Sequence, residues 1–115
     1  MKRVDMIVKA IEDTIELHKE AIERNMSYYD IRGKKRIKCP LCKTAEEISN
    51  EENAPRKCKV CPWYVFTGNI CAYHPVYDME ADFQSIERLE LWKNVIIQYP
   101  NTYFVNIMRA LRESQ

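Results

Sequence analysis

Five cysteines fall between residues 39 and 71 of this 115-residue chain, and their spacing restricts the possible folds more than any other feature. Cys39 and Cys42 form one C-x2-C pair, Cys58 and Cys61 form a second, and 15 residues separate the pairs. Two thiolates two residues apart in a tight turn can face one ion, and two such turns supply the four ligands of a tetrahedral zinc site. The spacing therefore predicts structural zinc bound by these four cysteines.

The fifth cysteine leaves the exact ligand set open. Cys71 and His74 make a C-x2-H unit after the two pairs. Cys71 could be a free buried thiol, a ligand that replaces one of the paired cysteines, or part of a two-zinc cluster with bridging thiolates. An iron–sulfur cluster also uses four thiolates, whereas a thioredoxin-like redox pair is disfavoured because neither C-x2-C opens a helix after a strand. We expect zinc as the metal. Cys71 is a fifth cysteine that competes with the paired cysteines as a candidate ligand, and His74 is a less favoured candidate.

Helical periodicity dominates outside the cysteine region. Apolar residues recur at i, i+3, i+4 and i+7 over residues 3–26, 79–99 and 102–113, which predicts three helices. Pro100 is expected to end the second of these, and Asn101 to cap the third. Only two glycines are present, which argues against a β-structure with many tight turns.

A cysteine-rich insert, residues 38–76, separates the first and second predicted helices. The insert is expected to be irregular, with a short strand at 63–66 and a helical turn near 44–53. Residues 28–38 form the connector before it, broken at Gly33. The predicted fold class is therefore mainly α, a single domain over 1–115 with about three helices and a zinc-knuckle-like insert.

The first predicted helix has a wide apolar stripe. Its main face consists of Val4, Ile7, Val8, Ile11, Ile15, His18 and Ile22. Met6, Ala10 and Leu17 widen the stripe, so we expect this helix to contact two neighbours. These could be the C-terminal helices of the same chain or a second copy, which makes a homodimer through the first helix possible. His18 is expected to pack at the edge of the core, and Trp63 and Trp92 to anchor it.

Charge is nearly balanced overall, at +1, but residues 32–59 carry nine basic and four acidic side chains. Lysine and arginine release counterions from nucleic acid, so a local patch can bind phosphates. The candidate contacts for nucleic acid or another partner are Arg32, Lys34, Lys35, Arg36, Lys38, Arg56 and Lys57. Tyr28, Tyr29 and Trp63 could offer stacking surfaces. A solvated loop is the favoured interpretation, because nucleic-acid-binding domains are usually more basic overall.

The remaining sequence signals concern location and chemistry. The first 20 residues contain acidic side chains and no apolar run typical of a secretory signal, and no stretch approaches the length of a membrane span. We expect a cytoplasmic protein, in which thiols stay reduced. No glycine-rich phosphate loop, H-E-x-x-H motif or catalytic triad is recognisable, so binding is favoured over catalysis.

The cysteine region contains CPLC at 39–42, CKVCPW at 58–63, Gly68 and Cys71. In this combination it resembles small proteins encoded by bacteriophages and prophages. The resemblance implies a phage or prophage origin, the host cytosol as location, a zinc-bound fold and a place for Cys71 in the pattern. It implies no activity.

Three functions are compatible with these features. The first is a zinc-stabilised protein that acts through protein–protein interaction, for example by inhibiting a host enzyme or defence system. The second is a nucleic-acid-binding accessory or regulatory protein that uses the basic residues at 32–59. The third is a zinc enzyme, which would need three protein ligands and a metal-bound water.

Overall fold

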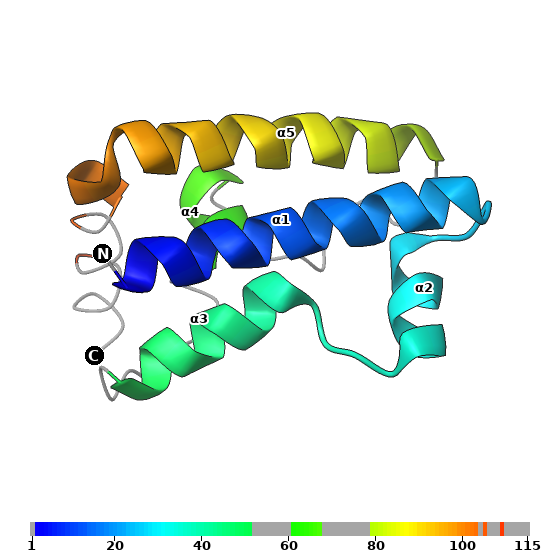
Figure 1. The fold of residues 1–115 in the computed structure, drawn as a ribbon, viewed down its shortest axis with the longest axis horizontal. Coiled ribbons are helices and arrows are strands. Elements are labelled where there is room, and N and C mark those ends of the chain that lie inside the picture. Colours follow the sequence, from blue (N-terminus) through cyan, green and yellow to red (C-terminus); the bar gives the residue numbers. More distant parts are fainter. Residues whose placement is uncertain (1, 52–60, 68–78, 104, 106–108, 110–115) are drawn as a thin grey trace.

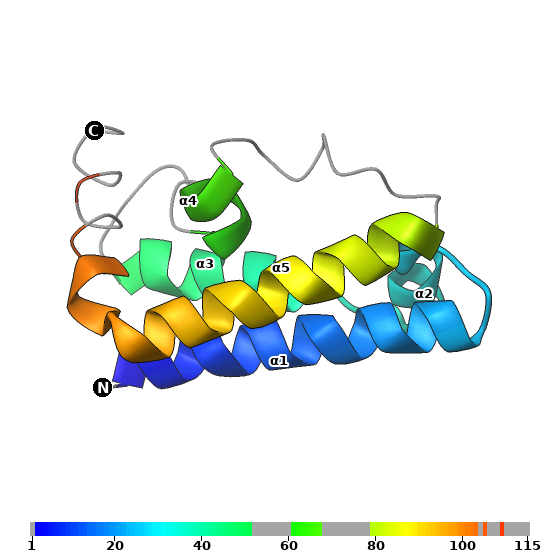
Figure 2. The ribbon, with the colours of Figure 1, turned by 90° about the horizontal axis from the view of Figure 1, so that it is seen from above.

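Two long antiparallel helices form the frame of the molecule (Figure 1). They are α1 (Lys2–Glu23) and α5 (Met79–Gln98), and they lie side by side in both views (Figures 1 and 2). The computed structural model describes residues 2–51, 61–67, 79–103, 105 and 109. Among these, α1 also contacts α2 (Tyr28–Lys35) and α3 (Pro40–Glu51). The wide apolar stripe of the first helix therefore has several neighbours within the same chain, whereas a homodimer through this helix stays a prediction.

The turn between α1 and α2 is encoded locally. Asn25 adopts a left-handed conformation with φ of 55°, and the Met26 N–H donates to the carbonyl of Ala21 at 2.8 Å. This reversal satisfies the last carbonyls of α1. Ser27 then caps α2, because its Oγ accepts a hydrogen bond from the N–H of Asp30 at 3.1 Å.

The end of α2 is formed in the same way as the end of α1, by a residue in the left-handed conformation. Arg36 has a φ of 56°, and its N–H and that of Ile37 bond back to the carbonyls of Gly33 and Arg32. Gly33 itself lies within the helix, and no atom lies within 4 Å of a Cβ placed there. The predicted break at Gly33 is therefore wrong, because capping at Ser27 and reversal at Arg36 set the helix boundaries.

Proline begins three of the helical segments. Pro40 is the first residue of α3, Pro62 is the first residue of α4 (Pro62–Thr67), and residues 100–103 form a further helical segment after α5. The preceding residue caps each segment, as the bonds from Lys43 N to Cys39 O and from Val65 N to Cys61 O show. Proline favours this position because it has no N–H to satisfy and its φ already suits a helix.

These starts overturn part of the sequence prediction. The prediction of three helices is wrong, since the described residues contain five labelled helices and the segment that starts at Pro100. The strand at 63–66 is wrong because those residues belong to α4, and Asn101 lies inside its helix instead of capping it. The described parts of the cysteine-rich insert are helical and not a separate irregular knuckle. The mainly helical fold class is confirmed.

The core explains why the insert folds with the rest. Buried apolar residues from α1, α3, α4, α5 and the segment 100–103 form one cluster: Ile7, Ala10, Ile11, Ile15, Leu41, Ala45, Ile48, Trp63, Leu89, Trp92, Ile96 and Tyr103. The Phe66 ring stacks on Trp92 at 5.1 Å, and Trp63 meets the same indole edge-on at 5.4 Å. Both tryptophans are thus core anchors, and α4 is bound to α5 by aromatic packing.

Candidate functional site

Three of the five cysteines line one small cavity of about 120 Å³ inside the helical frame. Cys39 precedes α3, Cys42 lies in its first turn, and Cys61 precedes α4. The two Cys-Pro steps thus place one thiol of each predicted pair at a helix start facing the same space. The structure thus places Cys61 in the lining of the same cavity as Cys39 and Cys42, which lie 19 or more positions earlier in the sequence. The cysteine spacing predicts all three as ligands of one zinc ion.

The donor chemistry of this cavity suits a soft cation. Cysteine thiolates and histidine nitrogens are the ligands that zinc takes in structural sites, and four ligands are needed to close the tetrahedron. In the part of the chain that the structure describes, no three His, Cys, Asp or Glu side chains are arranged to hold a metal ion. Cys58, Cys71 and His74 lie outside the described residues, as do Arg56 and Lys57. The residues that the structure describes therefore do not by themselves make a metal site, and the zinc ligand set stays a prediction.

Tyr28 reaches the cavity from α2 and hydrogen-bonds to Cys39. Its hydroxyl oxygen lies 2.9 Å from Cys39 Sγ, and only 5% of the residue is exposed. Burial raises the pKa of Tyr28 well above its usual value, and the neighbouring Cys39 raises it further. The phenol is therefore protonated at any physiological pH and can act as a donor toward sulfur.

His18 and Arg32 fix the ring of Tyr28. The His18 imidazole stacks on it with centroids 4.0 Å apart and planes within 9°. The guanidinium carbon of Arg32 lies 4.8 Å from the Tyr28 centroid and 4.6 Å from that of Tyr29. Burial lowers the pKa of His18 to about 4, with a smaller contribution from the positive charge of Arg32. His18 is therefore a neutral, packed histidine at pH 7, in agreement with the sequence prediction.

A second buried tyrosine lies near the other helix start. Tyr103 is 3% exposed, and its ring stacks with Phe66 of α4 at 5.9 Å. Burial raises the pKa of Tyr103 well above its usual value, and Cys61 adds to this effect. The two cysteines that cap α3 and α4 are thus each accompanied by a buried phenol.

The predicted basic patch is divided by contacts within the chain. Arg32 packs on the two tyrosines, and Lys35 pairs with Glu20 at 2.9 Å. Lys38 pairs with Glu46 at 3.5 Å, whereas Lys34 and Arg36 are exposed and make no ion pair with any described residue. Tyr28 and Trp63 are buried, so they cannot serve as stacking surfaces for bases; Tyr29 remains partly exposed.

Some of the predicted basic residues line one surface pocket. Arg36, Lys38 and Lys43 line a pocket of about 410 Å³ together with Asp13 and Pro40. Lys43 lies in α3, outside the set of candidate contacts chosen from the sequence. The structure adds it because the residues after α2 and the first turn of α3 line the same pocket.

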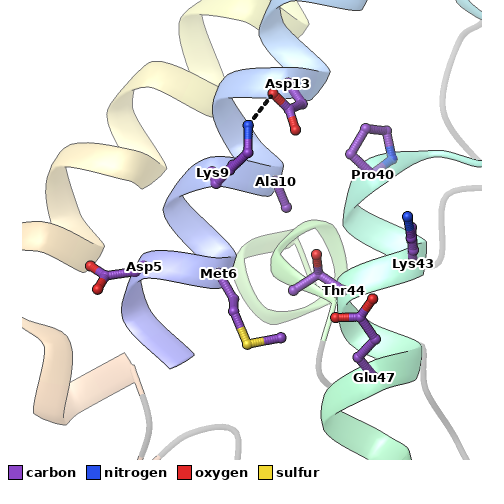
Figure 3. A pocket seen from close by; sticks show the side chains of 9 residues that line it. All are labelled: Asp5, Met6, Lys9, Ala10, Asp13, Pro40, Lys43, Thr44 and Glu47. Atoms are coloured by element: carbon purple, nitrogen blue, oxygen red, sulfur yellow. Dashed lines mark hydrogen bonds and ion pairs between the residues drawn. The ribbon is translucent and has the colours of Figure 1, made fainter. Parts of the chain in front are cut away.

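A longer groove adjoins this pocket between α1 and α3 (Figure 3). Its volume is about 660 Å³, and Met6, Ala10 and Pro40 contribute apolar surface. Charged side chains of both signs surround that surface: Asp5, Lys9, Asp13, Lys43 and Glu47. Lys9 and Asp13 pair across one turn of α1 at 3.3 Å. Nothing in the sequence pattern singles out this groove, because it depends on how α1 and α3 pack.

Comparison with protein-family models, curated proteins and solved structures gave no match. A search of the described helices found none with the length and apolar character needed to cross a membrane.

Proposed function

We propose that this chain is a small zinc-stabilised protein, of phage origin, that acts in the cytoplasm by binding another protein. The observation that supports the metal part is that Cys39, Cys42 and Cys61 all line one cavity. These residues come from the starts of two helices, next to the main core. Zinc held there would tie α3 and α4 together and contribute directly to folding.

The α1–α3 groove supports a protein as the partner. Interfaces between proteins typically have an apolar centre and a polar rim. The groove has that composition, with Met6 among its lining residues and both lysine and carboxylate side chains around it. A surface with both signs of charge suits a folded protein or peptide better than a polyanion. Inhibition of a host enzyme or defence system is the concrete form of this proposal.

The metal is tested first. Native mass spectrometry of the purified chain should give one zinc per chain and, in the same spectrum, the number of chains in the particle. Two zinc ions per chain, or iron with visible colour, would mean that the metal centre is not a single four-thiolate zinc site. A protein that contains no metal and five free thiols would contradict the proposal.

The partner is tested with a matched pair of variants. A protein captured from host lysate is purified and titrated against the wild type, Met6→Lys and Leu91→Lys. Met6 lies in the groove, whereas Leu91 is 61% exposed on α5. We expect Met6→Lys to weaken binding at least tenfold and Leu91→Lys to leave it unchanged. Equal affinities for the wild type and Met6→Lys would exclude the groove.

Nucleic-acid binding is the second candidate function, favoured by the pocket that Arg36, Lys38 and Lys43 line. Phosphate contacts give an affinity that falls steeply with salt. Binding of labelled single- and double-stranded DNA and RNA is measured at low and at moderate ionic strength. Loss of binding in the combined variant Arg36→Ala/Lys43→Ala would support this function, and absence of wild-type binding at low salt would exclude it. A zinc enzyme remains a prediction that requires one cysteine to leave the metal.

A further inference from the structure

We propose that Tyr28 is a positioning residue of the metal centre, which donates a hydrogen bond to the Cys39 thiolate and thereby selects Cys39 as a ligand. The inference rests on the proposed zinc site and goes beyond it, because it assigns a role to a residue outside the cysteine region. It also identifies Cys39, among the five cysteines, as one of the metal ligands.

The first step in the argument is the direction of the hydrogen bond. The Tyr28 hydroxyl oxygen lies 2.9 Å from Cys39 Sγ. A metal-bound cysteine is a thiolate, which has no proton and can only accept. Tyr28 must therefore be the donor whenever Cys39 is a ligand. Such donors to ligating atoms orient the ligand and tune the centre.

The second step is the rigidity of the donor. Tyr28 is 5% exposed and stacks against His18 at 4.0 Å. Its α2 backbone is fixed by the Ser27 cap, whose Oγ accepts from the Asp30 N–H. A phenol held in this way points at one sulfur without losing side-chain freedom when the metal binds.

The third step is charge. Several thiolates around Zn²⁺ carry more negative charge than the ion can neutralise. Arg32 lines the same cavity as Cys39, Cys42 and Cys61, and it forms no ion pair with a described carboxylate. Its guanidinium lies against the Tyr28 ring at 4.8 Å. A donor hydroxyl therefore contacts Cys39, and a cation lines the same cavity.

The experiment compares zinc affinity in the full chain by competition with a chromophoric chelator. The variants are Tyr28→Phe and, as a matched control, Tyr29→Phe, whose ring also contacts Arg32. We expect Tyr28→Phe to weaken zinc binding by about 10–100-fold, the usual effect of removing a partner of a metal ligand. Tyr29→Phe should stay within about twofold of the wild type. In the cobalt-substituted protein, the sulfur-to-cobalt charge-transfer bands should shift in Tyr28→Phe alone.

A double-variant cycle separates a role through Cys39 from a merely structural one. If Tyr28 acts through Cys39, the change Tyr28→Phe should have no further effect on zinc affinity in a Cys39→Ser background. An equal loss in both backgrounds, or an unchanged affinity and cobalt spectrum in Tyr28→Phe, would overturn the inference while leaving the zinc site intact. A wild-type protein that binds no zinc would overturn the site and the inference together.

Discussion

The imidazole of His18 lies flat on the phenol ring of Tyr28, with centroids 4.0 Å apart and an interplanar angle of 9°. This stack joins α1 to α2 and turns the Tyr28 hydroxyl toward Cys39. The Tyr28–Cys39 hydrogen bond therefore connects the cysteine region to the helical frame, in addition to the apolar core. The stability of this region should depend on the protonation of a histidine that is distant in sequence.

The first prediction concerns pH. His18 has an unfolded pKa of 6.5 and a folded pKa of about 4, so the unfolded chain binds its proton first as the pH falls. The free energy of unfolding should therefore decrease from about pH 6.5 downward, by on the order of 3 kcal/mol once pH 4 is reached. Urea denaturation at several pH values between 7.5 and 4.5 measures this. The variant His18→Phe retains a stacked ring and does not titrate, so its pH dependence should be shallower. Parallel profiles for the two proteins would show that another group is responsible.

The second prediction concerns the contact between α4 and α5. Trp92 is buried between Phe66 and Trp63. Replacing Trp92 with alanine removes both ring contacts and leaves a cavity, which should cost about 3–5 kcal/mol of unfolding free energy. Leu91→Ala, on the exposed side of the same helix, should change stability by less than about 0.5 kcal/mol. Chemical denaturation of both variants tests the pair. Similar small losses would mean that α4 does not depend on this contact.

The third prediction concerns the start of α2. Ser27→Ala removes the hydroxyl that accepts the Asp30 N–H at 3.1 Å, and it should destabilise the protein by about 1 kcal/mol. Ser27→Asp preserves the cap and serves as the control. Because α2 carries Tyr28, the alanine variant should also show faster amide hydrogen exchange over residues 28–35. Unchanged exchange there would show that tertiary packing alone holds the helix.

The fourth prediction concerns removal of zinc. A strong chelator should lower the melting temperature by more than about 10 °C, since about 1 kcal/mol corresponds to a few degrees and structural zinc supplies several kcal/mol. Trp63 follows Cys61 by two residues and contacts Trp92 at 5.4 Å. Tryptophan fluorescence and near-ultraviolet circular dichroism should therefore change as the metal leaves. In the variant Cys61→Ser the chelator should have little further effect. An unchanged melting curve in the wild type would contradict a structural metal.

The amino-acid sequence by itself determines the helical character of this protein. The repeat of apolar residues from Val4 to Ile22 predicts α1, and Pro100 marks the end of α5, because 3.6-residue periodicity and the missing proline N–H act locally. The burial of His18 was also readable, since it falls on the apolar face of α1. The same local reasoning fails at Pro40 and Pro62, because the sequence pattern predicts an irregular insert, whereas each of these prolines starts a helix.

Only the tertiary structure decides which distant side chains meet. The thiols of Cys39 and Cys61 share a cavity because α3 and α4 both pack on the α1–α5 pair, and Tyr28 reaches Cys39 because α2 folds back across α1. The groove between α1 and α3 and the pocket that includes Lys43 arise in the same way. Such contacts depend on the burial of several apolar faces at once, which no short stretch of sequence encodes.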